Sequence, residues 1–273
     1  MTSLSTRSLN EARERLRRTI DEYVRLDAEL RALENTNYRV SIFGSARIRP
    51  KDPLYREVFS LAQSLSERGI DVVTGGGPGL MSAANRGVLA SKRRRSLSYG
   101  LPLDLPTLVE PANRHLDITS AHKRFSSRLD EFLRLSHAVV VAPGGIGTLL
   151  ELMYVWQLLQ LHALDERPVI LLDRGFWGGL LDWMRSMPGE MGLLNMEDLD
   201  AVYLVDTPEE ALEIIERSYA RFLLDQGRVT LADARPESDA EREEHATSDL
   251  AEELRMQLQV TEQSSIRELH AAA

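Results

Sequence analysis

Two glycine-rich segments of this chain hold residues that could bind a phosphate group. The first is TGGGPGLM at residues 74–81, and the second is PGGIGTLLE at residues 143–151. Glycines let a backbone approach a ligand closely, and the free N–H groups at the start of a helix favour an anion. In the second segment we expect Thr148 to cap a helix and to donate to a phosphate oxygen, with Glu151 near the fourth helical position. The two segments therefore predict a phosphate site with a carboxylate beside it.

Each glycine-rich segment follows an apolar run that is typical of a buried strand. From residue 38 onward such runs alternate with helical patterns, which indicates a parallel sheet with helices on both faces. We expect an α/β fold, a Rossmann-like doubly wound parallel sheet over residues 38–224 with an added N-terminal helix and a C-terminal tail. The expected strands cover 39–43, 70–74, 96–103, 137–142, 168–172 and 201–205, and the expected helices cover 54–68, 79–90, 119–135, 148–162, 176–187 and 208–224.

The positions of the glycines exclude two common nucleotide sites. In a doubly wound sheet the ligand crevice lies at the carboxyl ends of the strands, where both segments are expected. The dinucleotide fingerprint G-x-G-x-x-G follows the first strand, but here that strand is followed by GSAR at residues 44–47. The chain also lacks G-x-x-x-x-G-K-[ST], which excludes a P-loop NTPase. A mononucleotide or sugar-phosphate site remains, and the alternative is that each segment is only a tight turn.

Four stretches of the chain resemble one known family. They are GSAR at 44–47, GGGPGLMSAANRGV at 75–88, the stretch 105–117, and PGGIGTLLE at 143–151, which matches the pattern P-G-G-x-G-T-x-x-E in full. Over about residues 39–206 the chain is similar to the LONELY GUY-type phosphoribohydrolases, a Rossmann-like group often labelled lysine decarboxylase. The resemblance implies hydrolysis of the N-glycosidic bond of a nucleoside 5′-monophosphate, such as AMP or a cytokinin ribotide, to free base and ribose 5-phosphate. It also implies a homodimer at least.

The same resemblance implies two catalytic residues and a set of substrate contacts. Glu151 would stabilise the oxocarbenium-like ribose and orient or deprotonate a water molecule. Arg128 would orient this carboxylate or bind the 5′-phosphate, although Leu129 follows it where the family usually has a lysine. No metal or other cofactor is expected. The expected substrate-binding residues are Gly44, Ser45, Gly75, Gly76, Gly77, Gly79, Asn113, Gly144, Gly145, Gly147 and Thr148.

Two other functions fit parts of the sequence. A non-catalytic protein that binds or carries a nucleotide or a pterin cofactor could use the same fold and loops, but it would not need both Arg128 and Glu151. The tetrapeptide SAHK at 120–123 is similar to sequences around pyridoxal-phosphate lysines, yet four such residues arise easily by chance. We therefore expect Lys123 on a helix surface and no decarboxylase. The six histidines show no metal-ligand spacing, which predicts no metal site.

The two ends of the chain differ from the central domain. Residues 1–37 are expected to form a helical extension, in which positions 8–34 have an apolar 3-4 spacing. This helix either packs on its own domain or contributes to a subunit interface. The apolar stretch 149–161 is a second expected interface between subunits. Residues 225–273 are acidic, which predicts a mobile tail.

Composition and charge limit the partners that we expect. The chain has no cysteine, which excludes disulfides and thiolate chemistry. It has no apolar run of membrane-spanning length and no signal-peptide pattern at its N-terminus, so we expect a cytoplasmic protein without a membrane partner. The formal net charge of −9 belongs mainly to residues 222–273, with 12 acidic and 5 basic side chains. The domain before them is nearly neutral, and its small, phosphate-sized loops predict no nucleic-acid partner.

Overall fold

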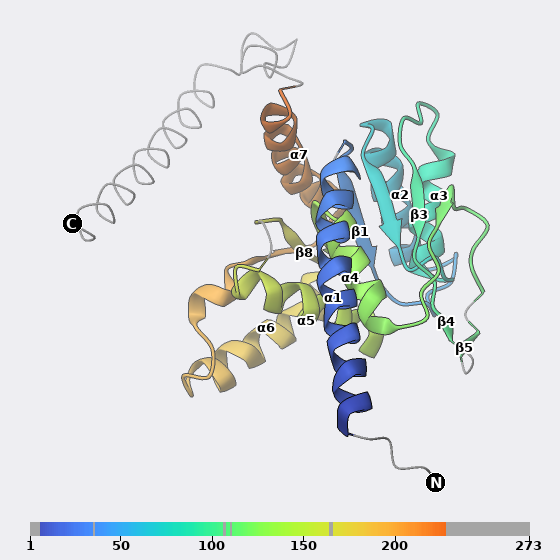
Figure 1. Cartoon of the computed structure of the whole chain (residues 1–273). Helices are drawn as coiled ribbons and strands as arrows, with labels where there is room; N and C mark the ends of the chain where they lie inside the picture. The colour runs from blue at the N-terminus through green and yellow to red at the C-terminus, as the bar shows by residue number, and fades with distance from the viewer. Residues whose placement is uncertain (1–5, 35, 106–107, 110, 164–165, 228–273) are drawn as a thin grey trace. The chain divides into compact units, whose positions relative to one another are not determined.

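A parallel sheet forms the centre of the protein (Figure 1). The structure is a computed structural model that describes residues 6–34, 36–105, 108–109, 111–163 and 166–227. Among these residues the sheet has seven strands in the order β6-β3-β2-β1-β7-β8-β9, and every pair in it is parallel. The strands are β1 (Arg39–Phe43), β2 (Asp71–Thr74), β3 (Ser98–Gly100), β6 (Ile118–Thr119), β7 (Ala138–Val141), β8 (Val169–Leu172) and β9 (Val202–Val205).

Helices cover both faces of the sheet, because successive side chains of a strand point to opposite faces. Val40 and Ile42 of β1 belong to a buried cluster with α2, α3 and α7, whereas Phe43 belongs to a second cluster with α4, α5 and α6. This arrangement confirms the expected Rossmann-like doubly wound fold. The helices are α1 (Thr6–Glu34), α2 (Pro53–Glu67), α3 (Leu80–Ala90), α4 (Phe125–Leu135), α5 (Ile146–Gln160), α6 (Arg174–Met184) and α7 (Pro208–Asp225), with the short η1 (Arg185–Gly189) and η2 (Met196–Leu199) after α6.

The order of the strands brings both glycine-rich segments to one edge of the sheet. The sheet grows outward from β1 in two directions, because β1 pairs with β2 on one side and with β7 on the other. Such a reversal of strand order opens a crevice at the carboxyl ends of the two central strands. The segment 74–81 follows β2 and the segment 143–151 follows β7, so they lie on either side of the loop that leaves β1.

The structure corrects two of the expected elements before the second glycine-rich segment. The helix expected over 119–135 begins at Phe125, because residues 118–119 form β6 beside β3. The backbone N–H groups of Asp117 and Ser120 donate to the carbonyls of Ser98 and Gly100, which holds this stretch extended. The strand expected over 96–103 is limited to 98–100. A small antiparallel pair follows it, made by β4 (Asp104–Leu105) and β5 (Leu108–Val109).

The start of α5 also differs from the expectation. This helix begins at Ile146 and not at 148, with Gly145 at the N-cap and no capping side chain. Thr148 therefore lies inside the helix and does not cap it. Glu151 occupies the sixth helical position, well over one turn from the helix start.

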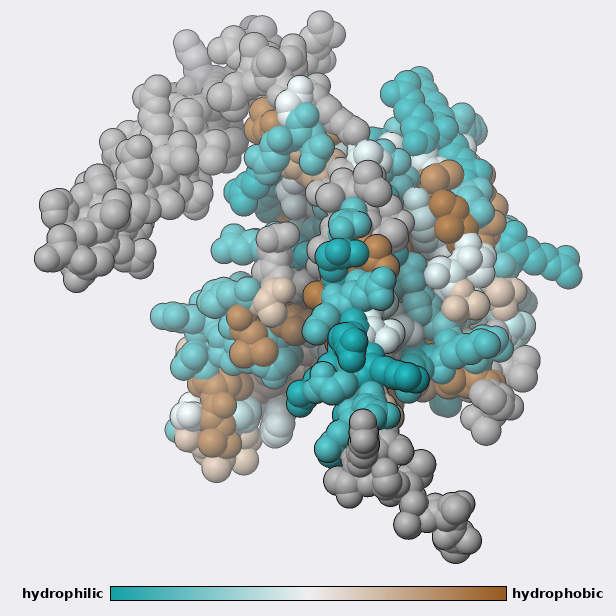
Figure 2. Space-filling view, viewed as in Figure 1, coloured by the Kyte–Doolittle hydropathy of each residue, from teal (hydrophilic) through white to brown (hydrophobic). Residues whose placement is uncertain are grey.

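The N-terminal helix α1 is exposed along its described length. All its side chains that the structure describes are exposed, and Figure 2 shows hydrophilic side chains on the face of α1 that is turned to the viewer. The tail expected over 225–273 lies outside the described residues, apart from 225–227. Of the helices in the described part of the chain, none is both long and apolar enough to cross a membrane.

Candidate active site

A buried ion pair joins α4 and α5 at the carboxyl edge of the sheet. Nη1 of Arg128 lies 3.2 Å from Oε1 of Glu151, and the two side chains are 9% and 12% exposed. Nε of Arg128 also donates to the carbonyl of Leu101 at 2.6 Å, just beyond β3. The guanidinium carbon lies 5.1 Å from the centre of the Phe132 ring, within the range of a cation–π contact. The guanidinium is thus fixed by a carboxylate, a backbone carbonyl and an aromatic ring.

The first glycine-rich segment leaves space for this guanidinium. A Cβ atom at Gly75 would overlap Nη2 of Arg128 and would lie 2.7 Å from Sδ of Met81. Gly76 has a φ of +74°, a left-handed conformation that favours glycine, and its N–H donates to Oγ1 of Thr74 at 2.9 Å. The glycines after β2 therefore let Arg128 reach Glu151 across the end of the sheet.

Backbone hydrogen bonds join three loops at this edge. The N–H of Ser45, after β1, donates to the carbonyl of Pro143 at 3.1 Å, and the carbonyl of Ser45 accepts from Leu80 N–H at 3.0 Å. Gly79 has a φ of +66°, and a Cβ atom there would overlap the Ser45 carbonyl oxygen. There is little space at Gly44 as well, because a Cβ atom added there would lie 2.7 Å from Cδ1 of Leu80. Hydrogen bonds through Ser45 thus connect the loops after β1, β2 and β7 at this edge of the sheet.

The start of α5 is open where a phosphate would bind. No heavy atom outside the local chain lies within 4 Å of a Cβ atom built at Gly145 or at Gly147. Gly144, in contrast, packs against Thr148, whose side chain is buried. The N–H groups of a helix start that lacks a capping side chain are a site for an anion.

Asn113 lies beside the first glycine-rich segment, where it acts on the backbone. Its Nδ2 donates to the carbonyls of Gly76 and Gly77 at 3.1 and 3.0 Å, and its own N–H donates to Gly76 at 2.7 Å. Nδ2 also lies 2.9 Å from Oδ1 of Asn85. These bonds hold the glycine backbone in place, so the geometry favours a positioning role for Asn113.

Asn85 also contacts this edge of the sheet, and the sequence alone does not predict this contact. Its fully buried side chain accepts from Oγ1 of Thr74 at 2.7 Å and donates to Oγ of Ser98 at 2.9 Å. It therefore links α3 to the ends of β2 and β3. The sequence offers one indication of this role. Asn85 is a polar amide among the buried apolar residues of the helix LMSAANRGVLA, and a buried amide needs hydrogen-bond partners.

A second hydrogen bond between α4 and α5 supports the ion pair and was also missed. The hydroxyl of Tyr154 donates to Oδ1 of Asp130 at 2.7 Å. This bond to a carboxylate, together with burial, raises the pKa of Tyr154 to about 12. Tyr154 stands three residues after Glu151, and Asp130 stands two residues after Arg128, so the two contacts connect the same parts of the two helices.

The SAHK tetrapeptide contributes to a different cluster on α4. Nε2 of His122 lies 2.7 Å from Oε2 of Glu131, and Oγ of Ser120 donates to the same oxygen at 3.1 Å. Arg134 pairs with the other carboxylate oxygen of Glu131 at 3.2 Å. Lys123 is exposed and lies in the bend before α4, so it is a surface lysine but not a helical one. Ser120 and His122 therefore have a structural explanation that needs no pyridoxal phosphate.

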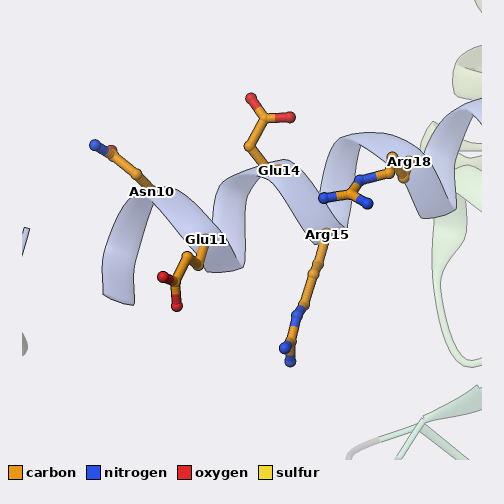
Figure 3. A pocket seen from close by; sticks show the side chains of 5 residues that line it. All are labelled: Asn10, Glu11, Glu14, Arg15 and Arg18. Atoms are coloured by element: carbon orange, nitrogen blue, oxygen red, sulfur yellow. The ribbon is translucent and has the colours of Figure 1, made fainter. Parts of the chain in front are cut away.

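A shallow hollow on α1 is unrelated to these loops. Figure 3 shows the side chains that line it, which all come from this single helix: Asn10, Glu11, Glu14, Arg15 and Arg18. They are polar and exposed, and none belongs to the glycine-rich segments. The candidate site is therefore placed at the sheet edge, where Arg128 and Glu151 lie beside the glycine-rich segments.

Fold and site together define a Rossmann-like protein with two glycine-rich loops at one sheet edge and a buried arginine–glutamate pair. The family described as "possible lysine decarboxylase" matches residues 81–215. The probable cytokinin riboside 5′-monophosphate phosphoribohydrolase LOGL3 of Oryza sativa subsp. japonica is 30% identical over 168 residues, which are 59% of this chain and 76% of that protein. The related LOGL2 is 31% identical and covers 65% and 72%. This chain belongs to the same phosphoribohydrolase family.

Two further comparisons are more limited. The pyrimidine/purine nucleotide 5′-monophosphate nucleosidase of Escherichia coli (strain K12) is 28% identical over 140 residues, and the chain spans about 30% of its length. The molybdenum cofactor binding protein of Rippkaea orientalis has a similar structure, with a TM-score of 0.50 and 20% identity over 66% of this chain and 96% of that one. This structural likeness concerns the fold alone. The relatives matched in sequence are named hydrolases, so the decarboxylase description does not fit them.

Proposed function

We propose that this protein hydrolyses the N-glycosidic bond of a nucleoside 5′-monophosphate, AMP or a cytokinin ribotide, to free base and ribose 5-phosphate. The observation that carries this function is the buried pair of Arg128 and Glu151, 3.2 Å apart, beside the open start of α5. A protein that only binds or carries a nucleotide or a pterin does not need a carboxylate and a guanidinium fixed in this way. The names of the sequence relatives support the same reaction.

The phosphate would bind at the start of α5. The backbone N–H groups of Gly145, Gly147 and Thr148 come from an uncapped helix start, and the helix dipole adds a positive potential there. Gly144 turns the chain into this start, and Gly75, Gly76 and Gly77 form the facing wall. Gly44, Ser45, Gly79 and Asn113 fix the loops through the backbone contacts described above, so we assign them to the site as positioning residues.

Glu151 would act on the ribose and on water. Cleavage of the bond between C1′ and the base nitrogen leaves positive charge on the ribose, and a nearby carboxylate stabilises that charge. The same carboxylate accepts a proton from water as the water oxygen bonds to C1′. The departing base nitrogen takes up a proton from solvent, to which Glu151 then releases its own. The electron pair of the broken bond leaves with the base, so the reaction needs no redox partner.

Arg128 would keep Glu151 in its reactive position. Its three fixed contacts leave little rotational freedom, and its charge attracts the neighbouring carboxylate. Leu129, in place of the family's lysine, packs in the buried part of α4 and contributes no charge here. The family's arginine therefore acts alone in this chain.

We also propose a homodimer, in which α5 contributes to the interface. Ile146, Leu150 and Met153 lie along one side of this helix and are 84%, 45% and 36% exposed. An exposed apolar row beside a ligand site is typical of a contact between subunits. We further propose that it acts in the cytoplasm, on a small-molecule substrate and without membrane or nucleic-acid partners.

Release of free base from a panel of nucleoside 5′-monophosphates tests this function. AMP should yield adenine and ribose 5-phosphate, and Glu151→Gln should lower kcat at least about 10³-fold, because the substitution removes the charge that stabilises the transition state. Glu213→Gln, an exposed glutamate on α7, is the matched control and should leave kcat unchanged. Nucleotide binding without release of base by the unmodified protein would instead support a carrier. Full activity of Glu151→Gln would remove Glu151 from the mechanism.

A further inference from the structure

The N-terminal helix α1 has an apolar face that its own domain does not bury. Leu9, Leu16, Ile20, Tyr23 and Leu26 are between 45% and 61% exposed. The helix touches α4, but that contact leaves these five side chains about half accessible to water. Exposure of so many large apolar side chains on one helix is unfavourable and indicates an interaction surface.

The apolar residues repeat with the spacing of a coiled coil. Leu9, Leu16 and Tyr23 stand seven residues apart, and Ala12, Thr19 and Leu26 form a second series with the same interval. In the sequence Leu30 and Leu33 continue the two series. A seven-residue repeat with two apolar positions packs one helix along another of similar length.

The charges of α1 are separated along its length. Residues 6–18 contain five basic and two acidic side chains, whereas residues 19–34 contain five acidic and two basic ones. The first half therefore has a net charge of +3 and the second half a net charge of −3. Figure 3 shows part of the basic half, in which Arg15 and Arg18 extend from different sides of the helix. A helix with this charge distribution is complementary to a second copy that runs in the opposite direction.

We infer that α1 forms an antiparallel two-stranded coiled coil with the α1 of a second copy of this chain. The two apolar series fix the register around a two-fold axis near Asp21. In this register Leu16 lies opposite Leu26 of the second copy, and the large ring of Tyr23 lies opposite the small Thr19. Ile20 lies opposite Ile20 of the second copy at the centre, where it extends the apolar seam.

Flanking charges favour this register. Arg15 stands next to Leu16 and falls opposite Glu29 of the second copy, and the symmetry makes this pair twice. Within one chain Glu29 lies 3.7 Å from the exposed Arg25, and an exposed ion pair of this kind costs little to exchange. Glu22 meets Glu22 of the second copy once, and this contact opposes the pairing. A parallel arrangement would instead bring the basic halves together and the acidic halves together along the whole helix.

Disulfide cross-linking of the full chain tests the direction of pairing. The natural chain has no cysteine, so introduced cysteines are the only thiols. Leu16→Cys/Leu26→Cys should form covalent dimers on mild oxidation, because position 16 of one copy lies against position 26 of the other. Within one helix these positions are about 15 Å apart, too far for a disulfide. Each single variant should stay monomeric under denaturing conditions, because equal positions lie about 15 Å apart in the antiparallel pair.

Other cross-linking results would overturn the inference. Efficient cross-linking of Leu16→Cys alone would show a parallel pair, since equal positions meet only in that arrangement. Absence of cross-links in the double variant, with base release at the natural rate as a measure of folding, would show that the apolar face packs within its own chain.

Charge exchange gives an independent test of the register. Arg15→Glu and Glu29→Arg should each weaken self-association about tenfold, because each variant turns two attractive pairs into repulsive ones. The double variant Arg15→Glu/Glu29→Arg should restore the association, measured by sedimentation of the full chain over a concentration series. Equal association of all four proteins, or no recovery in the double variant, would contradict the pairing of these two positions.

Discussion

Two buried arginine–carboxylate pairs lie at opposite ends of the central sheet. At the carboxyl end Arg128 pairs with Glu151, and at the amino end Nε of Arg39 lies 3.7 Å from Oδ2 of Asp71, whose side chain is fully buried. The first pair is surrounded by glycines and by the open start of α5. The second is enclosed, since Asp71 also accepts from Leu97 N–H at 2.8 Å and the Arg39 guanidinium lies 5.6 Å from the Tyr99 ring.

Aromatic rings close the amino end. Nδ1 of His137 accepts from Arg39 N–H at 3.1 Å, and its ring stacks on Tyr38 with centroids 5.1 Å apart. Phe222 packs edge-on against the same imidazole at 4.8 Å. The same residue types therefore have different uses at the two ends. Where glycines leave room for a ligand the pair can do chemistry, and where rings fill the space the pair holds strands together.

Breaking the amino-end pair should have the largest effect on stability. Asp71→Asn leaves the Arg39 charge buried without its counter-charge, so the free energy of unfolding should fall by about 3–5 kcal/mol. Urea denaturation of both proteins measures this change, and kcat per folded molecule should stay the same. Glu151→Gln should cost less stability, because Arg128 keeps its bond to Leu101 and its contact with Phe132. Equal losses from the two substitutions would show that both pairs are mainly structural.

As the pH is lowered, stability should be lost first through His137 at the amino end of the sheet. Burial, with Arg39 and Arg167 nearby, lowers the pKa of His137 from 6.5 to about 4. The pKa of His137 is lower in the folded protein than in the unfolded chain. The neutral histidine therefore contributes up to about 3 kcal/mol of stability above pH 6.5, and this contribution is lost as the pH falls toward 4. Burial raises the pKa of Asp71, which acts in the opposite direction. Unfolding curves between pH 4 and 7 should therefore be compared for the natural protein and His137→Asn, which keeps an acceptor for Arg39 but does not titrate. Parallel pH profiles of the two would count against this role for His137.

Filling the space beside Gly75 at the carboxyl end of the sheet should have a smaller effect, and that effect should appear in kcat. An alanine Cβ at position 75 would displace the Arg128 guanidinium from Glu151, so Gly75→Ala should lower kcat about 10- to 100-fold with little change in KM. Gly178→Ala is the control, since a Cβ there meets no atom within 4 Å and alanine suits the interior of α6. Unchanged base release by Gly75→Ala would mean that Arg128 need not stay where the structure places it.

Much of the fold could be predicted from the sequence because buried parallel strands are continuous apolar runs. β1, β7 and β8 fall within a residue or so of the expected positions. β6 could not be predicted, because Ile118 and Thr119 form a two-residue strand that is exposed and has no apolar run of its own. Only its backbone bonds to β3, made across a long separation in sequence, give it a strand conformation.

The candidate site could be predicted in its residues but not in its geometry. The family resemblance implies Arg128 and Glu151, and the structure brings them together from helices on one face of the sheet. The sequence predicts the start of α5 two residues late, because Thr148 is a good capping residue and Gly145, the actual N-cap, has no side chain that signals a helix start. The roles of Asn85 and Tyr154 depend on partners far away in sequence, which no local pattern reveals.

The loop after β1 has a further consequence. Ser45 is hydrogen-bonded on one side to the segment after β7 and on the other to the start of α3, so the short stretch 44–47 sets the spacing of the two walls of the crevice. For the proposed nucleotide substrate, a change of one residue in the length of 44–47 should alter which bases are accepted while leaving Arg128 and Glu151 in place.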